Sequence, residues 1–515
     1  MSLRSRLRLA AVVGVTLALI GAPSAVPAPS VPGPLWGCVL SGPPLRYIVL
    51  FTAATPEAEV TETIRGACGT STGYYREIGV AVATSTDPGF TARFGADRSY
   101  SAQAEALASG PVIPAMQHST DRVPGPPSGL TLDRSAEQWG MVLIHAPQAR
   151  AVNSGSPDVV VGVLDSGIDP AHPELAAAVD AERSAGCLSG VPDPRRSAWT
   201  PTTSAHGTHV AGIIAAADDR RGITGVAPGV RLASVKVVDD DGYIYPEYAV
   251  CGFMWAAHAR LRIANSSYVV DPWLLTCANV PGQAVVYEAV RRAVQYATAH
   301  GVLNIAATGN ERMDLSNPRQ DRHSPDNTPE PQPRLVNHTC QVLPAELPGV
   351  VAVSAVGAYR IKAGYSSYGL GVVAVTAPGG DIDQQPGVSS SGCVLSTIPG
   401  GYGYACGTSM AAPHASGVAA LLASAHPDAG PEQLATLLRQ QADPLPCPAS
   451  GDRTGTQDGG CVGEVVNSFA GHGLVDAWQA VTAPPVPARL GSVAGCGAVE
   501  RGIAHRGTLA DGTDR

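Results

Sequence analysis

Short apolar runs alternate with helical patterns along most of the chain. Runs rich in branched residues predict strands at 159–164, 232–238, 261–265, 302–306, 350–356 and 372–376. Helical patterns lie between several of these runs. Continuous runs such as VVVGVL are typical of strands that are buried on both faces. The pattern predicts an α/β, three-layer domain with a mostly parallel central sheet and helices on both faces.

A smaller unit precedes this domain. Its pattern predicts strand, helix, strands, helix and strand at 46–52, 56–65, 74–83, 101–108 and 111–115. Thr55 is the expected N-cap of the first helix. This order in about 70 residues suits a small α+β domain. A Pro/Gly-rich linker follows at 121–129.

The first residues have the pattern of a secretory signal. Arg4, Arg6 and Arg8 are followed by the apolar stretch Leu9–Gly21 and then by small residues up to Ala28. The apolar stretch is short for a bilayer span, although an uncleaved anchor is the alternative. We predict a secreted, extracellular protein with no membrane span after signal removal. The expected organisation is signal 1–28, propeptide unit and linker 29–130, main domain 131–483 and flexible tail 484–515.

Composition excludes some classes of partner. Hydrophobic residues make up 44% of the 515 residues and charged residues only 15%, which fits a folded, loop-rich protein. The net charge is −9 and the body of the chain has no run of Lys or Arg, so nucleic acid is not an expected partner. We expect a monomer.

The chain has 11 cysteines, which suits an exported protein. Several lie close together in sequence, at 38/68, 251/277, 393/406 and 447/461, but sequence alone does not fix the connectivity. No C-x-x-C pair occurs, which favours disulfides over zinc. Because the count is odd, Cys496 in the tail is the candidate for the cysteine left over.

Asp165 ends the first predicted strand, in VVVGVLDSGID. The carboxyl ends of parallel strands open onto the ligand crevice of such sheets, and an acidic side chain at this end would face the crevice. Taken alone, Asp-Ser-Gly is also an ordinary turn signal.

Two histidines begin a helical pattern in SAHGTHVAGIIAA. His206 lies at the start of the helix, where it can face the crevice, and Ser204 could cap the helix. His209 lies three residues later, so a metal pair is one alternative. The H-E-x-x-H pattern is absent, and a packed, hydrogen-bonded His209 is the preferred interpretation.

Ser409 begins the longest apolar helical run, in CGTSMAAPHASGVAALL. Gly407 permits close backbone approach just before it. A serine at a helix N-terminus sees free backbone N–H groups, which can stabilise an oxyanion. Pro413 comes early in the helix, where a missing N–H costs least. A simple capping role for Ser409 is the alternative.

The three segments together resemble the subtilase family of serine proteases, peptidase family S8. The matching motifs are VVGVLDSGID, HGTHVAG and GTSMAAPHASGVAALL, and the order Asp, His, Ser is the one known for subtilisin. Weaker matches include AATGNE at Asn310 and GHGLVDAWQAV from Gly471. The resemblance spans about Gln138 to Val481.

The resemblance implies a role for each matching residue. Ser409 would be the nucleophile, His206 the general base and acid, and Asp165 the residue that orients the imidazole. The Asn310 side chain and the Ser409 N–H would bind the oxyanion. No cofactor is required for this chemistry. The unit at 29–130 would be a propeptide that assists folding and temporarily inhibits the enzyme.

The resemblance also implies substrate contacts at Ser267, Tyr268, Val269 and Gly309. In IANSSYVV, Val269 and Val270 stand where the family usually has two glycines. These side chains could narrow or redirect the first specificity pocket, or the chain could simply follow another route here. Both alternatives stay open at the level of sequence.

Two further segments depart from the family or are ambiguous. A polar, Pro-rich insert at 312–348 carries Cys340, follows Asn310 closely and could wall the cleft. The acidic residues Asp239–Asp241 favour a solvated turn over a metal site. Structural calcium is common in the family, but we assign no calcium site and no other metal site from the sequence.

The sequence therefore predicts a secreted serine endopeptidase that is made as a self-processing precursor and acts on polypeptides through an acyl-enzyme. The alternative within the same class is a selective leader-peptide processing protease rather than a broadly degradative one. Other classes are a non-catalytic protein that keeps the fold for binding, and a zinc protein that uses His206, His209 and cysteines.

Overall fold

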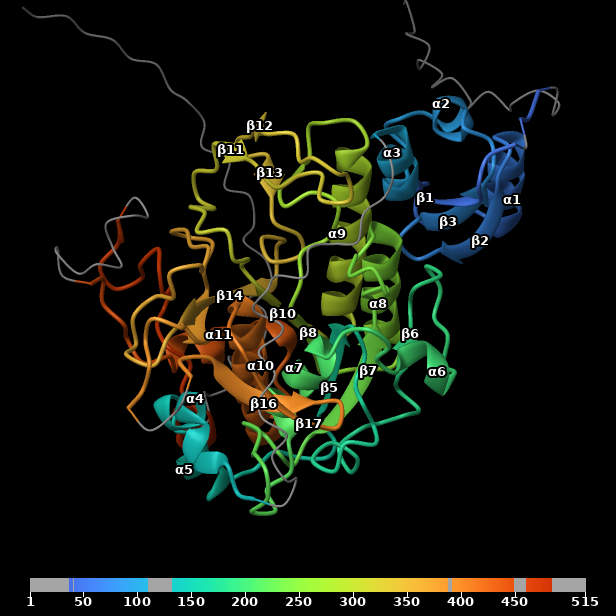
Figure 1. Cartoon of the computed structure of the whole chain (residues 1–515). Helices are drawn as coiled ribbons and strands as arrows, with labels where there is room; N and C mark the ends of the chain where they lie inside the picture. The colour runs from blue at the N-terminus through green and yellow to red at the C-terminus, as the bar shows by residue number, and fades with distance from the viewer. Residues whose placement is uncertain (1–36, 40, 110–131, 388–390, 449–459, 484–515) are drawn as a thin grey trace, which may run out of the picture.

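Two main sheets organise the protein, one in each of its two domains (Figure 1). The computed structural model describes residues 37–39, 41–109, 132–387, 391–448 and 460–483. The predicted signal at 1–28, the predicted strand at 111–115, the linker at 121–129, the tail at 484–515 and Cys496 lie outside these residues.

The large sheet has seven strands in the order β15-β14-β10-β8-β5-β7-β6, and all neighbouring strands are parallel. The predicted parallel α/β sheet is thus confirmed. Its strands are β5 Val160–Asp165, β6 Ala185–Gly186, β7 Arg231–Lys236, β8 Ile263–Ser266, β10 Leu303–Ala307, β14 Val350–Val356 and β15 Val375–Pro378.

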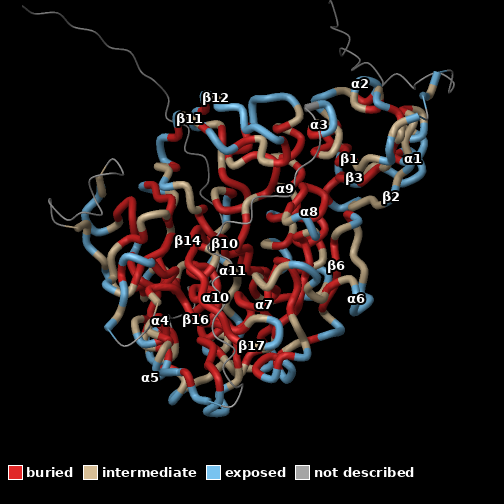
Figure 2. The backbone as a smooth tube through the Cα atoms, viewed as in Figure 1, coloured by how far each residue is buried: buried red, intermediate tan, exposed pale blue. Residues whose placement is uncertain are grey.

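Helices cover both faces of this sheet, because its strands are apolar on both sides. In β5, Val161 and Val163 pack with α7 (His206–Ala215) and α10 (Thr408–Ala425). The alternate residues Val160 and Leu164 pack with α8 (Pro246–His258) and α9 (Gln283–Ala299). Buried residues, red in Figure 2, follow the sheet and α10 through the middle of the molecule.

Shorter elements complete the large domain. They are the 3₁₀ turn Ser135–Glu137, α4 Trp139–Leu143, α5 Ala146–Arg150, α6 Arg196–Trp199, α11 Pro431–Gln440 and α12 Ala477–Thr482, and the short strands β9 Thr276–Cys277, β11 Gln320–Asp321, β12 Arg334–Leu335, β13 Cys340–Gln341, β16 Val394–Ile398 and β17 Gly401–Ala405. None of the helices in the described ranges combines the length and apolarity needed to cross a lipid bilayer.

The small domain is an antiparallel sheet with helices on one face, as the α+β pattern predicts. Its sheet order is β2-β3-β1-β4, from β1 Leu45–Leu50, β2 Thr70–Tyr75, β3 Val80–Ser85 and β4 Ser99–Tyr100, with α1 Glu57–Gly66, α2 Phe90–Phe94 and α3 Ala102–Ser109. One detail is wrong. The N-cap of α1 is Pro56, and the Thr55 hydroxyl donates to the Thr52 carbonyl instead.

The small sheet is apolar on both faces and belongs to two cores. Tyr47 and Val49 of β1 pack with α1 and α2 inside the domain. Ile48, which points the other way, packs in the same cluster as α8 and α9 of the large domain. The small domain accordingly lies beside these two helices in Figure 1.

Five disulfides join ten of the 11 cysteines, as the cysteine count suggests. The pairs are Cys38–Cys68, Cys187–Cys251, Cys277–Cys340, Cys393–Cys406 and Cys447–Cys461. The proximity of Cys251 and Cys277 in sequence does not correspond to a bond. Cys277 instead ties β9 to β13 in the insert, where the two strands pair antiparallel.

Candidate active site

Three neighbouring strands end at the edge of the large sheet where several candidate site residues lie. β5, β8 and β10 are adjacent and parallel, so their carboxyl ends lie together. Asp165 is the last residue of β5, Ser267 follows β8, and Asn310 lies three residues beyond β10. The sheet order thus brings together residues that are far apart in sequence, at the edge where parallel sheets hold their ligands.

Asp165 and His206 form a directed pair in which the aspartate is buried and the histidine is partly exposed. The His206 Nδ1 lies 2.7 Å from Asp165 Oδ1, and the aspartate side chain is 2% exposed against 13% for the histidine. Oδ1 also accepts the Ser166 N–H at 2.7 Å. His206 is the first residue of α7, and its N–H donates to Ser204 Oγ at 3.2 Å. This arrangement fixes the imidazole with Nδ1 toward the carboxylate.

Ser409 lies in the first turn of the 18-residue helix α10. Backbone N–H groups in this turn have no partner inside the helix. The preceding Thr408 donates both its N–H and its hydroxyl to Asn310 Oδ1, at 2.9 and 3.0 Å. With Oδ1 held by Thr408, the Asn310 amide N–H group is directed away from that contact.

Pro413 leaves a carbonyl of α10 without its helical donor. A residue at this position would normally donate its N–H to the carbonyl of Ser409, four residues earlier, and proline has no N–H. Ser267 Oγ supplies the hydrogen bond instead, at 2.9 Å from the Ser409 carbonyl. In return, Ser409 Oγ donates to the Ser267 carbonyl at 3.1 Å. Pro413 is therefore tolerated early in the helix and, in addition, leaves the Ser409 carbonyl free to accept the Ser267 hydroxyl.

A buried polar relay supports this exchange and was missed from the sequence. Asn265 Nδ2 donates to Ser267 Oγ at 2.9 Å, and Ser416 Oγ donates to Asn265 Oδ1 at 2.9 Å. Both residues are fully buried. Their only signal in the sequence is a polar residue inside an apolar run, at the third position of IANS for Asn265 and at the third position of HASG for Ser416.

His209 occupies a buried site away from the Asp165–His206 pair. Its Nε2 lies 3.1 Å from the Gly403 carbonyl, in agreement with the packed, hydrogen-bonded interpretation. Burial lowers its pKa to about 3, with a smaller contribution from His206. The two histidines therefore take different partners.

The valines that replace glycine turn toward the interior. Val270 is fully buried, and its N–H donates to the Leu343 carbonyl at 2.9 Å. Val269 is half-buried against the apolar cluster that contains Leu315 and Val342 of the insert. Tyr268 is buried as well.

Gly309 has a conformation that glycine alone adopts easily. Its φ is +94°, and a Cβ there would lie 2.5 Å from Glu311 Oε2. A side chain at this position would therefore crowd the segment that carries Asn310.

The acidic turn is held by its own backbone. Asp239 Oδ1 accepts the N–H groups of Asp241 and Tyr243, at 3.1 and 2.9 Å. Asp240 is exposed and contacts Thr202 and Lys236. These contacts fit the predicted turn.

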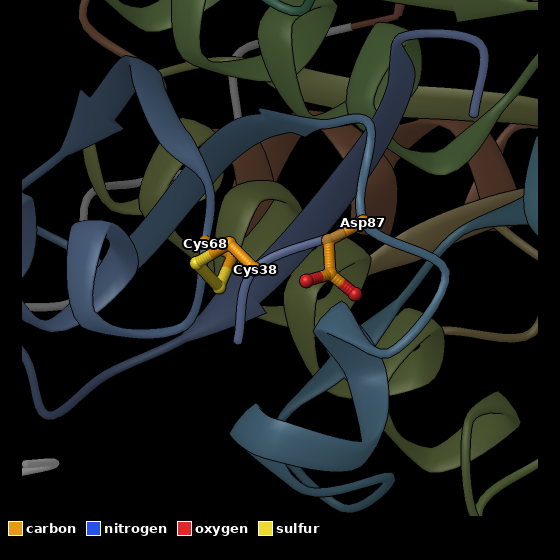
Figure 3. Close-up of side chains that lie close together, drawn as sticks. All are labelled: Cys38, Cys68 and Asp87. Atoms are coloured by element: carbon orange, nitrogen blue, oxygen red, sulfur yellow. A yellow bond between two sulfur atoms is a disulfide. The ribbon is translucent and has the colours of Figure 1, made fainter. Parts of the chain in front are cut away.

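Within the described ranges, one group of side chains is close enough to suggest a metal site. It comprises Cys38, Cys68 and Asp87 of the small domain (Figure 3). The two sulfurs are joined as a disulfide, so they are not thiolate ligands. Asp87 accepts the N–H groups of Val39 and Gly89 at 2.9 and 2.7 Å. The chemistry of this group does not fit a metal ion.

The chain belongs to the subtilase family. The family model described as "Subtilase family" matches residues 156–473, which is more than half of the chain and contains the whole candidate site. The resemblance seen in the three motifs is thereby confirmed.

Curated relatives agree with this assignment. Fervidolysin of Fervidobacterium pennivorans is 33% identical over 325 residues, which cover 60% of this chain and 40% of that protein. Subtilisin E of Bacillus subtilis (strain 168) is 32% identical over 56% of this chain and 61% of its own. Subtilisin DY of Bacillus licheniformis is 30% identical over 60% of this chain and 92% of its own. The chain thus spans less than two thirds of fervidolysin and of subtilisin E.

Solved structures show the same fold. The epidermin leader peptide processing serine protease of Staphylococcus aureus matches with a TM-score of 0.60 at 20% identity, over 85% of this chain and 98% of that one. A lanthipeptide protease matches with a TM-score of 0.50 at 25% identity, over 69% of this chain and 98% of that one.

Buried ionisable groups of the large domain lead us to expect a measurable pH dependence of stability. Burial lowers the pKa of His414, in α10, to about 4. In an unfolded chain histidine binds its proton near pH 6.5. Between these values the unfolded state holds more protons, so this group lowers the free energy of unfolding as the pH falls. Burial raises the pKa of Glu174 and Glu346 to about 7, and these groups act in the opposite direction.

The effect of His414 should therefore be measured as a difference. We expect His414→Asn, made in a Ser409→Ala background, to reduce the slope of unfolding free energy against pH between pH 5 and 6. The reduction should approach about 1.4 kcal/mol per pH unit, the value for one proton. Denaturant titrations provide the measurement, with exposed His338→Asn as control. Equal slopes for His414→Asn and its parent would contradict the prediction.

Proposed function

We propose that the protein is a serine endopeptidase in which Ser409, His206 and Asp165 form the catalytic triad. The observation that carries the proposal is the 2.7 Å contact between His206 Nδ1 and Asp165, in a fold that also places a serine in the first turn of a long helix. These groups lie at the ligand-binding edge of a subtilase fold. The substrates are polypeptides, the established substrate class of such triads.

The chemistry proceeds in two halves. The Ser409 hydroxyl first turns from the Ser267 carbonyl toward His206. Its Oγ then attacks the peptide carbonyl carbon while His206 Nε2 takes the hydroxyl proton. The C–N bond then breaks, and the imidazolium returns this proton to the leaving amine. Water adds to the acyl-enzyme with the same base, which releases the acid and restores the serine. Asp165 stabilises the imidazolium throughout and keeps Nδ1 protonated.

The oxyanion formed in each half has two proposed donors. One is the backbone N–H of Ser409, in the first turn of α10. The other is the side-chain amide of Asn310, whose Oδ1 is held by Thr408. Donors that are fixed before the reaction stabilise the developing charge without further reorganisation, and one such donor is typically worth about 10²–10³ in turnover.

The nucleophile is tested by labelling with a fluorophosphonate probe for serine hydrolases. The folded wild type should be labelled, directly or after limited proteolysis has removed the small domain, and Ser409→Ala should not. Ser424→Ala is the control, because Ser424 lies at the other end of the same helix, where its hydroxyl donates to the Ala420 carbonyl and accepts the Ser156 N–H. Loss of Ser409 should lower peptide hydrolysis by about 10⁴-fold or more. Folded wild type that stays unlabelled would instead indicate a binding protein.

We further infer that the small domain is a propeptide and that the protein is secreted as a precursor. Five disulfides support an oxidising compartment.

The domain interface is built around two helices of the large domain. Arg292 of α9 donates to the carbonyls of Phe51 and Ile78, at 2.9 and 3.0 Å. Arg46 donates to the Tyr248 hydroxyl of α8 at 3.0 Å and faces the buried Glu247 at 3.7 Å.

Maturation should therefore remove the small domain. The purified active enzyme should begin between about Gly110 and Gln138, because this segment follows the domain and precedes the matched family region. N-terminal sequencing provides the measurement, and Ser409→Ala should keep the domain attached if the enzyme processes itself. Active protein that is recovered only at full length would reject this part of the proposal.

Selective processing of leader peptides is the second candidate function. It is favoured by the insert, because Val269 of the substrate segment packs against the insert cluster and the insert begins two residues after Asn310. The insert therefore borders the proposed cleft. The similarity to a lanthipeptide protease at 25% identity points the same way.

A peptide panel separates selective processing from broad degradation. Selective processing predicts cleavage at one or two bonds in a mixture of unrelated peptides, because a bordered cleft admits few sequences. Mass spectrometry of the products provides the measurement, with subtilisin E as a control. Cuts at many unrelated bonds would support degradation.

A further inference from the structure

We propose that the β16–β17 hairpin, closed by the Cys393–Cys406 disulfide, is a positioning element that keeps Ser409 aligned with His206. The inference deepens the proposed function, since it takes Ser409 and His206 as the reacting pair. It assigns a role in the reaction to residues that do not touch the substrate.

The first strand of the hairpin is fastened to the helix that carries the base. Ser396 Oγ donates to the His209 carbonyl at 2.6 Å, and Thr397 Oγ1 donates to the Thr208 carbonyl at 2.7 Å. Both hydroxyl residues are fully buried. The accepting carbonyls lie in α7, two and three residues after His206. The hairpin is therefore attached to the beginning of α7, the part of the helix that carries His206.

The packing at this contact leaves no space for a side chain on α7. A Cβ at Gly212 would lie 2.3 Å from Thr397 Oγ1 and 2.5 Å from Ser396 Oγ. The ring of His209 adds a third link, from α7 to the Gly403 carbonyl of the second strand. Both strands of the hairpin are thus attached to the same helix.

The second strand runs directly into the nucleophile. β17 ends at Ala405, and only Cys406, Gly407 and Thr408 separate it from Ser409. Gly407 donates its N–H to the Gly379 carbonyl at 2.9 Å. The end of β17 and the contact with Gly379 together position the three residues that lead into the first turn of α10.

The disulfide closes the hairpin at this end. Val394 and Ala405 form the last pair of the ladder, and Cys393 and Cys406 are the next residues on the two strands. Their Cα atoms are 4.7 Å apart and both side chains are buried. The bond therefore prevents separation of the strands where β17 leaves toward Ser409, while the hydroxyl contacts hold β16 on α7. Together they form a continuous connection from the helix of the base to the nucleophile.

A matched control exists in the same chain. Cys447–Cys461 spans 14 residues of sequence, against 13 for Cys393–Cys406, so removal of either bond frees a similar loop of unfolded chain. If the Cys393–Cys406 bond only stabilised the folded protein, removal of either disulfide should have the same effect on the reaction rate. If the bond positions Ser409, the two removals should differ in their effect on that rate.

The test compares the maximal rate of phosphonylation by a fluorophosphonate, and its apparent dissociation constant, in the wild type, C393A/C406A, T397V and C447A/C461A. Thr397→Val removes the anchoring hydroxyl and keeps the disulfide, so it tests the proposal even if C393A/C406A does not fold. Melting temperatures of all four proteins are measured, and rates are taken well below the lowest.

We expect C393A/C406A and T397V to lose at least about tenfold in maximal rate, with the dissociation constant within about twofold, because small misplacements of reacting groups cost this much or more. C447A/C461A should keep the wild-type rate. Rates within about twofold of wild type for T397V and for folded C393A/C406A, or an equal loss in C447A/C461A, would overturn the inference alone. A folded wild type that does not react even after limited proteolysis has removed the small domain would instead overturn the proposed function, and the inference with it.

Discussion

The hydrogen bonds exchanged between Ser267 and Ser409 connect the end of β8 to the first turn of α10, and the geometry of the site depends on them. The exchange requires a carbonyl free to accept, and Pro413 provides one by omitting a helical N–H. It also requires an oriented Ser267 hydroxyl, which Asn265 supplies by donating to it. The position of the proposed nucleophile is thus defined by the sheet as well as by its own helix.

The two faces of the small sheet explain how a separate domain becomes part of the larger core. Tyr47 and Val49 complete an internal core, whereas Ile48 completes the core of the neighbouring domain. At the edge of this contact the buried Glu247 faces Arg46 at 3.7 Å, and burial raises the pKa of Glu247 to about 6. This contact buries apolar surface of α8 and α9, which would favour continued association of the small domain with the large one even if the proposed maturation cleaved the chain between them.

The sequence predicted features that depend on local pattern and on motifs of the chain. Continuous apolar runs indicated the parallel strands, and the segments around Asp165 and His206 indicated the pair that the structure brings together. Features that depend on tertiary contacts could not be predicted from the sequence. Cys251 bonds to Cys187 rather than to its neighbour in sequence, because the sheet brings distant segments together. The relay through Asn265 was missed since a buried amide has no distinctive pattern of its own.

Two different kinds of connection join the helices of the proposed base and nucleophile. The first runs through the sheet, because β5 ends at Asp165, the partner of His206, and the adjacent β8 leads to Ser267, the partner of Ser409. The second runs through the β16–β17 hairpin, whose hydroxyls hold α7 and whose second strand leads into α10. The sheet side holds the first turn of α10 at two places, where Thr408 donates to Asn310 and where Ser409 and Ser267 exchange hydrogen bonds. The hairpin adds an attachment from the side of α7, so that this turn is fixed both to the sheet and to the helix of the proposed base.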